Sequence, residues 1–405
     1  MPSEFTTDDL AVRDAARRFR REAVDPMEPH VREWVDDHDA RFPWEVVEEG
    51  SRRGLRTLAV PREHGGGGAT VLQLSLAVEE IAAGDMGTAV IFDQTWKISH
   101  MIAQLATEEQ QQWLWPRFVA DDRFLLAIAV AEVEHSTDVA MSRLLQEVDG
   151  RPVALDTRAV QDGNSWVLDG SKMMPSLAST AALLVVMAQT EPDRGIHDGC
   201  SYFLVPRDTP GLRVTRVWDK ISQRLADNAG LAFDSCRIPT GNLLGRRGEA
   251  RTHPTTSGGN VEAAATTLGS ARSAYEDALV YARERIQGGR PIIEHQAVGL
   301  MLAQMATELE GARSLVWRAA RALDAGDTTT PLQFMAKWQA AEVAVRVCLQ
   351  AMEVFGGKAI LRETPVQKHL RDCLSFLHSD GTQQSRLALI QHRLISDPTS
   401  LAPYP

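Results

Sequence analysis

The sequence predicts an α+β protein that is mostly helical, with a compact β-barrel-like domain between two helical domains. Three observations predict this fold class: helical periodicity up to about position 125, short strand-like runs from 126 to 245, and long helical patterns beyond 246. Helices and strands do not alternate along the chain, which argues against a doubly wound sheet. We therefore divide the chain into an N-terminal helical domain (1–125), a β domain (126–245) and a C-terminal helical bundle (246–405).

The first domain is expected to consist of helices joined by a glycine-rich loop. Apolar and alanine residues recur at helical spacing in four stretches: Asp8–Ala23, Leu72–Ala83, Phe92–Leu105 and Glu108–Val119. The segment 61–68 ends in four consecutive glycines. It is expected to be a loop, because glycine loses much backbone entropy inside a regular element.

The β domain is predicted from short apolar runs separated by turn residues. Thr157–Val160 and Trp166–Leu168 flank the turn sequence Asp-Gly-Asn-Ser, so they are expected to form a hairpin. An apolar run precedes the hairpin and further strands follow it: Leu125–Ala131, Leu183–Met187, Tyr202–Val205, Leu212–Trp218 and Gly230–Phe233.

The last domain begins after a polar linker, 246–259, that is rich in glycine, threonine and arginine. Apolar residues then recur every three or four positions in long stretches, which predicts amphipathic helices packed on one side. The predicted helices are Val261–Ile286, Val298–Leu323, Leu332–Phe355 and Thr382–Leu394. Long helices with short joins are typical of an up-down four-helix bundle.

Composition excludes several classes of function. The chain has 405 residues, 44% hydrophobic and 24% charged, which indicates a globular protein with more than one structural unit. A net charge of −11 argues against a nucleic-acid or anionic-membrane partner, because both require a basic face. The N-terminus is acidic and no apolar run is long enough to span a membrane, which predicts a cytoplasmic chain. The four cysteines have no close spacing, so we expect reduced thiols and no metal site.

Two stretches near the C-terminus resemble the acyl-CoA dehydrogenase family. Positions 353–357, Glu-Val-Phe-Gly-Gly, are similar to the family's Gln-x-Phe-Gly-Gly, and positions 379–384, Ser-Asp-Gly-Thr-Gln-Gln, are similar to Tyr-Glu-Gly-Thr-x-Gln. Similar segments at 60–66, 168–173, 233–239 and 291–297 extend the resemblance over nearly the whole chain. The resemblance implies the acyl-CoA dehydrogenase fold, whose helix–β–helix order matches the one predicted above.

The resemblance also implies a reaction. Members bind FAD and oxidise an acyl thioester of CoA or acyl carrier protein: a carboxylate removes the α-proton and the β-hydride passes to the flavin. Electrons then leave to an electron-transfer flavoprotein, and the enzymes are homotetramers or homodimers. Asp380 occupies the position of the catalytic glutamate. Its carboxylate lies about 1.5 Å further back, and a misplacement of that size costs ~100-fold in rate.

The substrate expected from these changes is a cyclic or branched acyl thioester rather than a straight-chain one, because Ser379 also replaces a bulkier tyrosine beside the base. Asn260 falls where many members carry an arginine near the thioester. Gly259 falls where some members place their base instead, so no second base is expected there.

The family's cofactor positions carry over one by one. Thr137 stands for the serine that bonds the pyrophosphate, Ser176 for the threonine beside flavin N5, and Arg285 for the arginine that meets the pyrophosphate of the neighbouring subunit. The remaining matches are Gln296, Gly356, Gly357, Thr382 and Gln384. The segment 131–138 departs from the family motif, Met174 replaces a common tryptophan, and about a dozen residues around 144–155 look inserted.

Three alternatives remain open at this point. Asp380 and Gln383 have the spacing of a helix capping box, so Asp380 has a purely structural interpretation. A flavin oxidase of the same fold, similar to nitroalkane oxidase, also uses an aspartate base, although its arginine seven residues later is matched only approximately by Arg386. The altered flavin positions are also typical of a non-catalytic subunit that pairs with an active paralogue.

Overall fold

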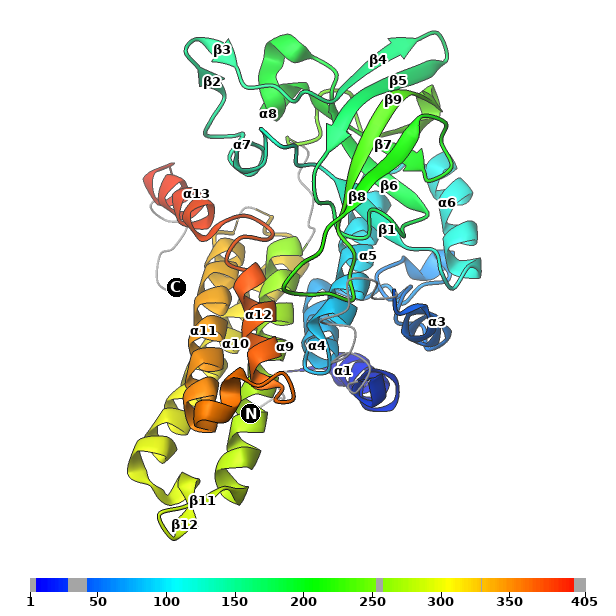
Figure 1. The fold of residues 1–405 in the computed structure, drawn as a ribbon. Helices are drawn as coiled ribbons and strands as arrows, with labels where there is room; N and C mark the ends of the chain where they lie inside the picture. The colour runs from blue at the N-terminus through cyan, green and yellow to red at the C-terminus, as the bar shows by residue number, and fades with distance from the viewer. Residues whose placement is uncertain (1–4, 28–41, 253–257, 329, 397–405) are drawn as a thin grey trace.

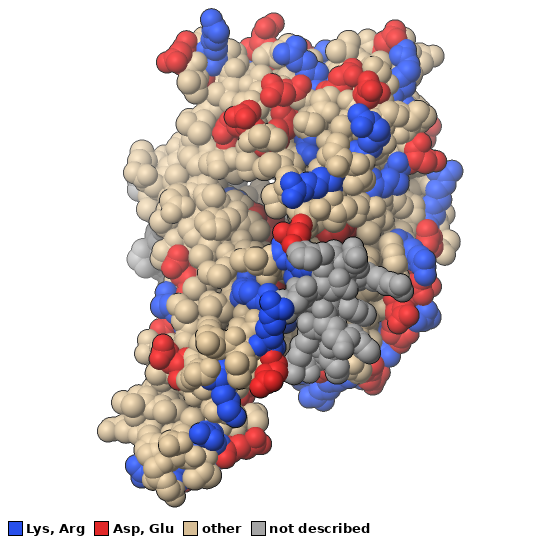
Figure 2. Space-filling model, in the orientation of Figure 1, with Lys and Arg blue, Asp and Glu red and all other residues tan. Residues whose placement is uncertain are grey.

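A computed structural model describes residues 5–27, 42–252, 258–328 and 330–396. It confirms a mostly helical protein in which a central sheet domain lies between helical regions (Figure 1). On the face seen in Figure 2, basic and acidic residues are interspersed without a broad basic area. Within the described ranges, no helix is both long enough and apolar enough to cross a membrane.

The N-terminal helices pack around one fully buried helix. Their bounds are α1 (Thr7–Phe19), α3 (Trp44–Arg52), α4 (Val71–Ala82), α5 (Met86–Leu105) and α6 (Glu108–Ala120). Every residue of α4 is buried, because α1, α5, α9 and α10 all pack against it. Side-chain caps define where these helices start. Thr70 and Gln73 form a capping box at α4, and the carboxylate of Asp85 accepts a hydrogen bond from Thr88 N at α5.

The β domain is built on one eight-stranded sheet with the order β10-β7-β6-β4-β5-β9-β8, in which β1 also pairs with β6. Its strands are β1 (Leu126–Ala129), β4 (Arg158–Asp162), β5 (Ser165–Lys172), β6 (Leu183–Gln189), β7 (Cys200–Pro206), β8 (Leu212–Val217), β9 (Ala229–Pro239) and β10 (Leu243–Leu244). The predicted hairpin is the antiparallel pair β4–β5, and Gly163 in its turn has a φ of 58°.

The segment around 144–155 forms a small addition beside the sheet. After the short helix α7 (Thr137–Ala140), the strands β2 (Glu147–Val148) and β3 (Arg151–Pro152) pair as a hairpin. This hairpin packs near α8 (Gly195–Gly199), since Ile196 N donates to Val153 O at 2.7 Å. The addition therefore has defined structure and lies at the edge of the β domain (Figure 1).

Four helices form the bundle: α9 (Gly259–Glu284), α10 (Gln296–Asp324), α11 (Leu332–Phe355) and α12 (Val366–Ser375). A small hairpin, β11 (Ile286–Gln287) and β12 (Arg290–Pro291), joins α9 to α10 at the end far from the sheet (Figure 1). Our sequence analysis missed α12, which is short and carries several polar residues. The predicted last helix, α13 (Gln383–Ser396), packs against α11 close to the β domain.

Candidate functional site

A cavity of about 1370 Å³ lies between the β domain and the helices. Residues from all three predicted domains line it, including Gln94 of α5, the segment 173–176 before β6, and the segment 375–382 before α13. Six of the predicted site residues line this one cavity: Thr137, Ser176, Asn260, Ser379, Asp380 and Thr382. Segments far apart in sequence therefore meet around a space larger than a typical single-ligand pocket.

The other five predicted residues do not line the cavity. Arg285 and Gln296 are exposed at the β11–β12 end of the bundle, opposite the sheet (Figure 1). Gly356 and Gly357 follow α11, and Gln384 is an exposed residue of α13. A cofactor bound in this cavity has no contact with Arg285 of the same chain.

The backbone around Asp380 has an unusual conformation. Asp380 has a φ of 53° and Gly381 a φ of 93°, both in the left-handed region. Aspartate is among the few residues with a side chain that tolerate this region. Arg386 donates to the carbonyl of Asp380, and Lys337 donates to the carbonyl of Phe376. Two buried cations therefore hold the loop that presents Asp380.

The hydrogen bonds at the start of α13 assign the helix cap to Thr382. Its hydroxyl accepts from Ser385 N at 3.2 Å, whereas the Asp380 carboxylate accepts no such bond from a described residue. The capping-box interpretation of Asp380 was therefore wrong. Instead, the Asp380 side chain is 34% exposed and one of its oxygens lies 3.5 Å from Lys97 Nζ. Its backbone N–H donates to no group within the described residues.

Behind Asp380 lies a buried cluster of charged residues that sequence reasoning missed: Asp93 and Lys97 of α5 and Glu262 of α9. Lys97 Nζ lies 2.6 Å from Asp93 Oδ2. Burial raises the pKa of Asp93 to about 6, and burial together with Asp93 raises the pKa of Glu262 well above its usual value. Burial disfavours the charge on Lys97, but Asp380, Asp93 and Glu262 together raise its pKa. Together with Asp380, the cluster brings three carboxyl groups that act electrostatically on one ammonium.

A signal for this cluster does exist in the sequence. Asp93 and Lys97 are spaced i, i+4 within a stretch whose other residues predict a buried helix, and Glu262 stands in an alanine-rich turn. Charged residues are almost never fully buried unless they are paired or change their protonation state, so charges in such positions point to a buried cluster. Glu262 also lies one helical turn after Gly259, where no second base was expected.

On the β-domain side, Asn228 and Lys220 form hydrogen bonds that hold Ser176 in position; the sequence analysis had not identified either residue. Asn228 Nδ2 donates to Ser176 Oγ at 3.2 Å and to Met174 O at 2.7 Å. The ammonium of Lys220 donates to Asn228 Oδ1 at 2.5 Å and to the Ala226 carbonyl at 2.7 Å. Burial lowers the pKa of Lys220 to about 8. These bonds fix the wall that carries Ser176.

The segment 131–138, which departs from the family motif, is held in place by an ion pair and hydrogen bonds of Glu132. Lys172 Nζ lies 2.7 Å from Glu132 Oε1, and Glu132 also accepts from the backbone N–H groups of Asp156 and Thr157. Thr137 then begins α7 and lines the cavity.

Asn260 is not a helix cap, because Gly258 occupies that position. Asn260 Nδ2 instead donates to Gln333 Oε1 at 3.1 Å. In the described parts of the chain, no cluster of His, Cys, Asp or Glu is arranged to hold a metal ion.

Comparison with known proteins accounts for this architecture. Models of the N-terminal, middle and C-terminal domains of acyl-CoA dehydrogenase match residues 6–122, 127–236 and 255–395. The short-chain specific acyl-CoA dehydrogenase of Bos taurus mitochondria is 34% identical over 95% of this chain and 90% of its own length.

Solved structures agree with these matches. Butyryl-CoA dehydrogenase from Megasphaera elsdenii superposes with a TM-score of 0.87 at 27% identity, covering 98% of this chain and 100% of that one. A chain reported with the electron transferring flavoprotein of Acidaminococcus fermentans superposes at 0.89 with 30% identity, covering 98% and 100%.

The residues around the cavity fit a flavin dinucleotide. The space is large enough for the cofactor and a second ligand together. Hydroxyls of Ser136, Thr137 and Ser176 stand in its wall as hydrogen-bond donors, and the indole N–H of Trp218, also in the wall, has no acceptor among the described residues. Hydroxyl and N–H donors are the groups that bind phosphate and flavin ring atoms.

Proposed function

Because the chain belongs to the acyl-CoA dehydrogenase family, and is therefore an FAD-dependent oxidoreductase, we propose that it oxidises an acyl thioester at the α,β-position with Asp380 as the base. The observation that carries this proposal is the placement of the Asp380 carboxylate in the wall of the same cavity as Ser176. Asp219, another acidic residue of that wall, is paired with Arg224 instead.

Two groups of Asp380 have separate tasks in the proposed reaction. Its carboxylate oxygen accepts the α-proton, and its free backbone N–H donates to the thioester carbonyl, where negative charge develops. FAD supplies the hydride acceptor for the β-hydrogen. Arg386 and Lys337 keep the loop in place, so the carboxylate and the N–H act from one rigid segment.

The buried cluster supports a compact acyl group, cyclic or branched. Asp93, Lys97 and Glu262 are almost completely buried and occupy the space behind Asp380. The Lys97 side chain also lies close to Gly259, since a Cβ at Gly259 would lie 3.9 Å from Lys97 Cδ. A long apolar chain directed there would have to displace paired charges, which costs several kcal/mol.

The proposal includes partners and location. We assign an electron-transfer flavoprotein as electron acceptor, a CoA or carrier-protein thioester as substrate, and a homotetramer or homodimer as the assembly, all by similarity to the family. The four cysteines are free and buried, which fits a reducing compartment such as the cytoplasm.

Substitution of Asp380 tests the proposed base. Asp380→Asn and Asp380→Ala are expected to reduce turnover of an accepted thioester at least ~100-fold while the purified proteins keep their flavin absorbance. Asp234→Asn, at an exposed position of β9 outside the cavity, is the matched control and should behave as the wild type. Undiminished turnover in both Asp380 variants would rule out the base assignment.

A further inference from the structure

Among the basic residues that line the cavity, three come together from separate segments of the β-domain side. Arg143 lies between α7 and β2, His197 lies in α8, and Arg251 follows β10; all three line the cavity. Burial lowers the pKa of His197, and the charges of Arg251 and Arg143 lower it further against the opposing effect of Asp198. The two arginines therefore act on the same histidine and create a local positive potential there.

Asp198 opposes the effect of the two arginines on His197, but no described carboxylate pairs with the arginines themselves. Neither Arg143 nor Arg251 forms an ion pair with any described residue, and Asp198 does not line the cavity. Nearby acids have other partners: Glu191 lies 2.7 Å from Arg247, and Glu249 pairs with Arg246. Arg143 is exposed and Arg251 half-buried, so an anionic ligand that enters the cavity could supply the counter-charge that the protein does not provide.

The segments that carry the three residues are tied to the sheet and to one another. Val153 N donates to Gln146 O at 3.0 Å within the added hairpin, and Ile196 N donates to Val153 O at 2.7 Å, which joins α8 to it. Ala250 N donates to Cys200 O at 2.9 Å, which fixes the residue before Arg251 to β7. The backbone next to His197 and Arg251 is thus held in place in advance of any ligand.

From this geometry we propose that Arg143, His197 and Arg251 bind the phosphate that ends the pantetheine arm of the thioester substrate, an inference that rests on the proposed function. Two guanidinium groups and an imidazole suit a phosphate, because each arginine can donate two parallel hydrogen bonds to its oxygens. The same cavity holds Asp380, so one extended molecule can reach both places. CoA and an acyl carrier protein both carry this phosphate.

The test compares one acyl group on pantetheine, on phosphopantetheine, on CoA and on a carrier protein. The double variant Arg143→Ala/Arg251→Ala is expected to raise KM at least about tenfold for the three phosphorylated forms, with KM for acyl-pantetheine, kcat and flavin content unchanged. Arg143→Lys/Arg251→Lys should recover part of the loss. Arg158→Ala, an exposed position of β4 outside the cavity, is the control.

Other outcomes overturn the inference in recognisable ways. Loss of bound flavin would assign the cations to the cofactor's pyrophosphate, and an equal change for all four thioesters would show a general effect on the cavity. A loss confined to CoA would point to its adenosine phosphates. If the wild-type protein oxidised none of the four thioesters, the proposed function itself would fail. If the wild-type protein does oxidise the thioesters, its kcat/KM values for the CoA form and the carrier-protein form identify the physiological carrier.

Discussion

At the scale of single residues, Asp380 combines a short side chain with a backbone conformation that few residues adopt. Its φ of 53° turns the loop so that the carboxylate lines the cavity, while Arg386 holds the carbonyl of the same residue. The direction of the side chain is therefore set by the loop and by Lys97. Because aspartate has one methylene fewer than glutamate, its carboxylate extends less far into the cavity.

Restoring that methylene should change substrate preference. Asp380→Glu is expected to raise the ratio of kcat/KM for butyryl-CoA to that for cyclohexanecarboxyl-CoA by about tenfold or more, because the longer carboxylate reaches a straight chain that the wild type holds too far away. Steady-state kinetics with both thioesters measure the ratio. A wild-type enzyme that already prefers the straight chain would contradict the compact-substrate expectation.

Lys97 links Asp380, the proposed base, to the buried acids, and two variants separate its roles. Lys97→Met leaves Asp93 buried without a cation and should lower the free energy of unfolding by about 3 kcal/mol, as measured by urea denaturation. The double variant Lys97→Met/Asp93→Leu removes both charges and should recover most of that stability. Turnover should stay several-fold reduced in both variants, because Asp380 has lost its ion pair in each. Wild-type turnover in the stable double variant would show that Lys97 only stabilises the fold.

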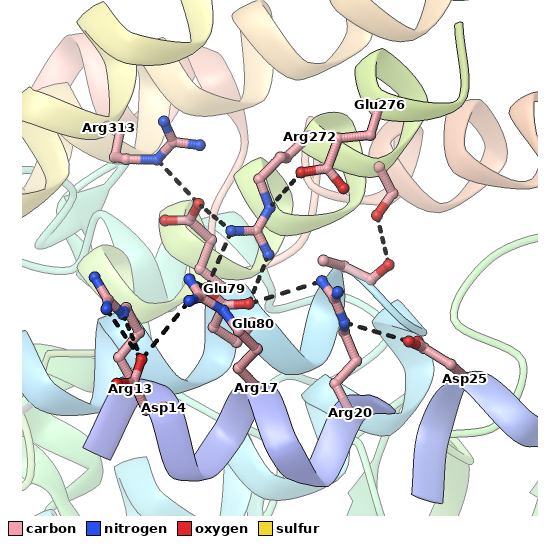
Figure 3. Close-up of polar contacts among 12 residues, drawn as sticks. Arg13, Asp14, Arg17, Arg20, Asp25, Glu79, Glu80, Arg272, Glu276 and Arg313 are labelled. Atoms are coloured by element: carbon pink, nitrogen blue, oxygen red, sulfur yellow. Dashed lines mark hydrogen bonds and ion pairs between the residues drawn. The ribbon is translucent and has the colours of Figure 1, made fainter. Parts of the chain in front are cut away.

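At the scale of elements, a network of buried ion pairs joins the N-terminal helices to the bundle. Arg17 of α1 and Arg272 of α9 both contact Glu80 of α4, at 2.7 and 3.0 Å, while Arg313 of α10 contacts Glu79 at 3.0 Å (Figure 3). Four helices from opposite ends of the sequence thus meet at two adjacent glutamates. Removing the Glu80 carboxylate leaves Arg17 and Arg272 with longer contacts, among them those to Asp14 at 3.7 Å and to Glu79 at 3.6 Å. Loss of one partner from a largely buried ion-pair network is costly.

The network predicts how stability depends on pH. Burial alone would raise the pKa of Glu80, but hydrogen bonds from Arg17 and Arg272 outweigh it and lower the pKa to about 2 from its usual 4.5. The folded state therefore gains about 3 kcal/mol above pH 4.5, and this gain disappears as pH falls from 4.5 towards 2. Glu80→Gln should be less stable than the wild type by a similar amount at pH 7, with the difference shrinking below pH 4.5.

Denaturation curves at several pH values measure this difference. Glu276→Gln is the matched control, because Glu276 lies at the edge of the same network with a half-exposed side chain. A difference between Glu80→Gln and the wild type that stays constant down to pH 2 would contradict the assigned role of Glu80.

The elements also show what the sequence could predict. The long helices α9, α10 and α11 follow from apolar residues repeated over many turns, and the β4–β5 hairpin follows from its Asp-Gly turn. α12 did not follow, because it has only ten residues and its buried face includes His369 and Asp372. The charged cluster at Asp93 and Lys97 was also missed, since its meaning depends on contacts with Glu262 and Asp380 from distant segments.

At the scale of the whole molecule, the predicted cofactor residues fall into two groups at opposite ends of the bundle. Thr137 and Ser176 line the cavity, whereas Arg285 lies at the β11–β12 hairpin (Figure 1). One chain does not bring these groups together. An assembly in which the hairpin of one subunit reaches the cavity of another would do so, which fits the proposed homotetramer or homodimer.

Flavin retention should therefore depend on the hairpin. Arg285→Ala is expected to weaken flavin binding about tenfold without unfolding the chain, because Arg285 is exposed and its described partner is only Gln287. The flavin-to-protein absorbance ratio after gel filtration measures the loss. Arg290→Ala, on the same hairpin, is the control; equal loss in both variants would indicate damage to the hairpin rather than a lost phosphate contact.

The cavity takes its walls from three separate regions: Gln94 from the first helices, Ser176 from the sheet and Asp380 from the segment before α13. None of these regions contains a complete site. Small relative movements of these three regions, well short of unfolding any of them, are thus sufficient to separate Gln94, Ser176 and the proposed base Asp380. Catalytic competence should accordingly be the most heat-sensitive property of the enzyme, lost while its helices and sheet are still intact.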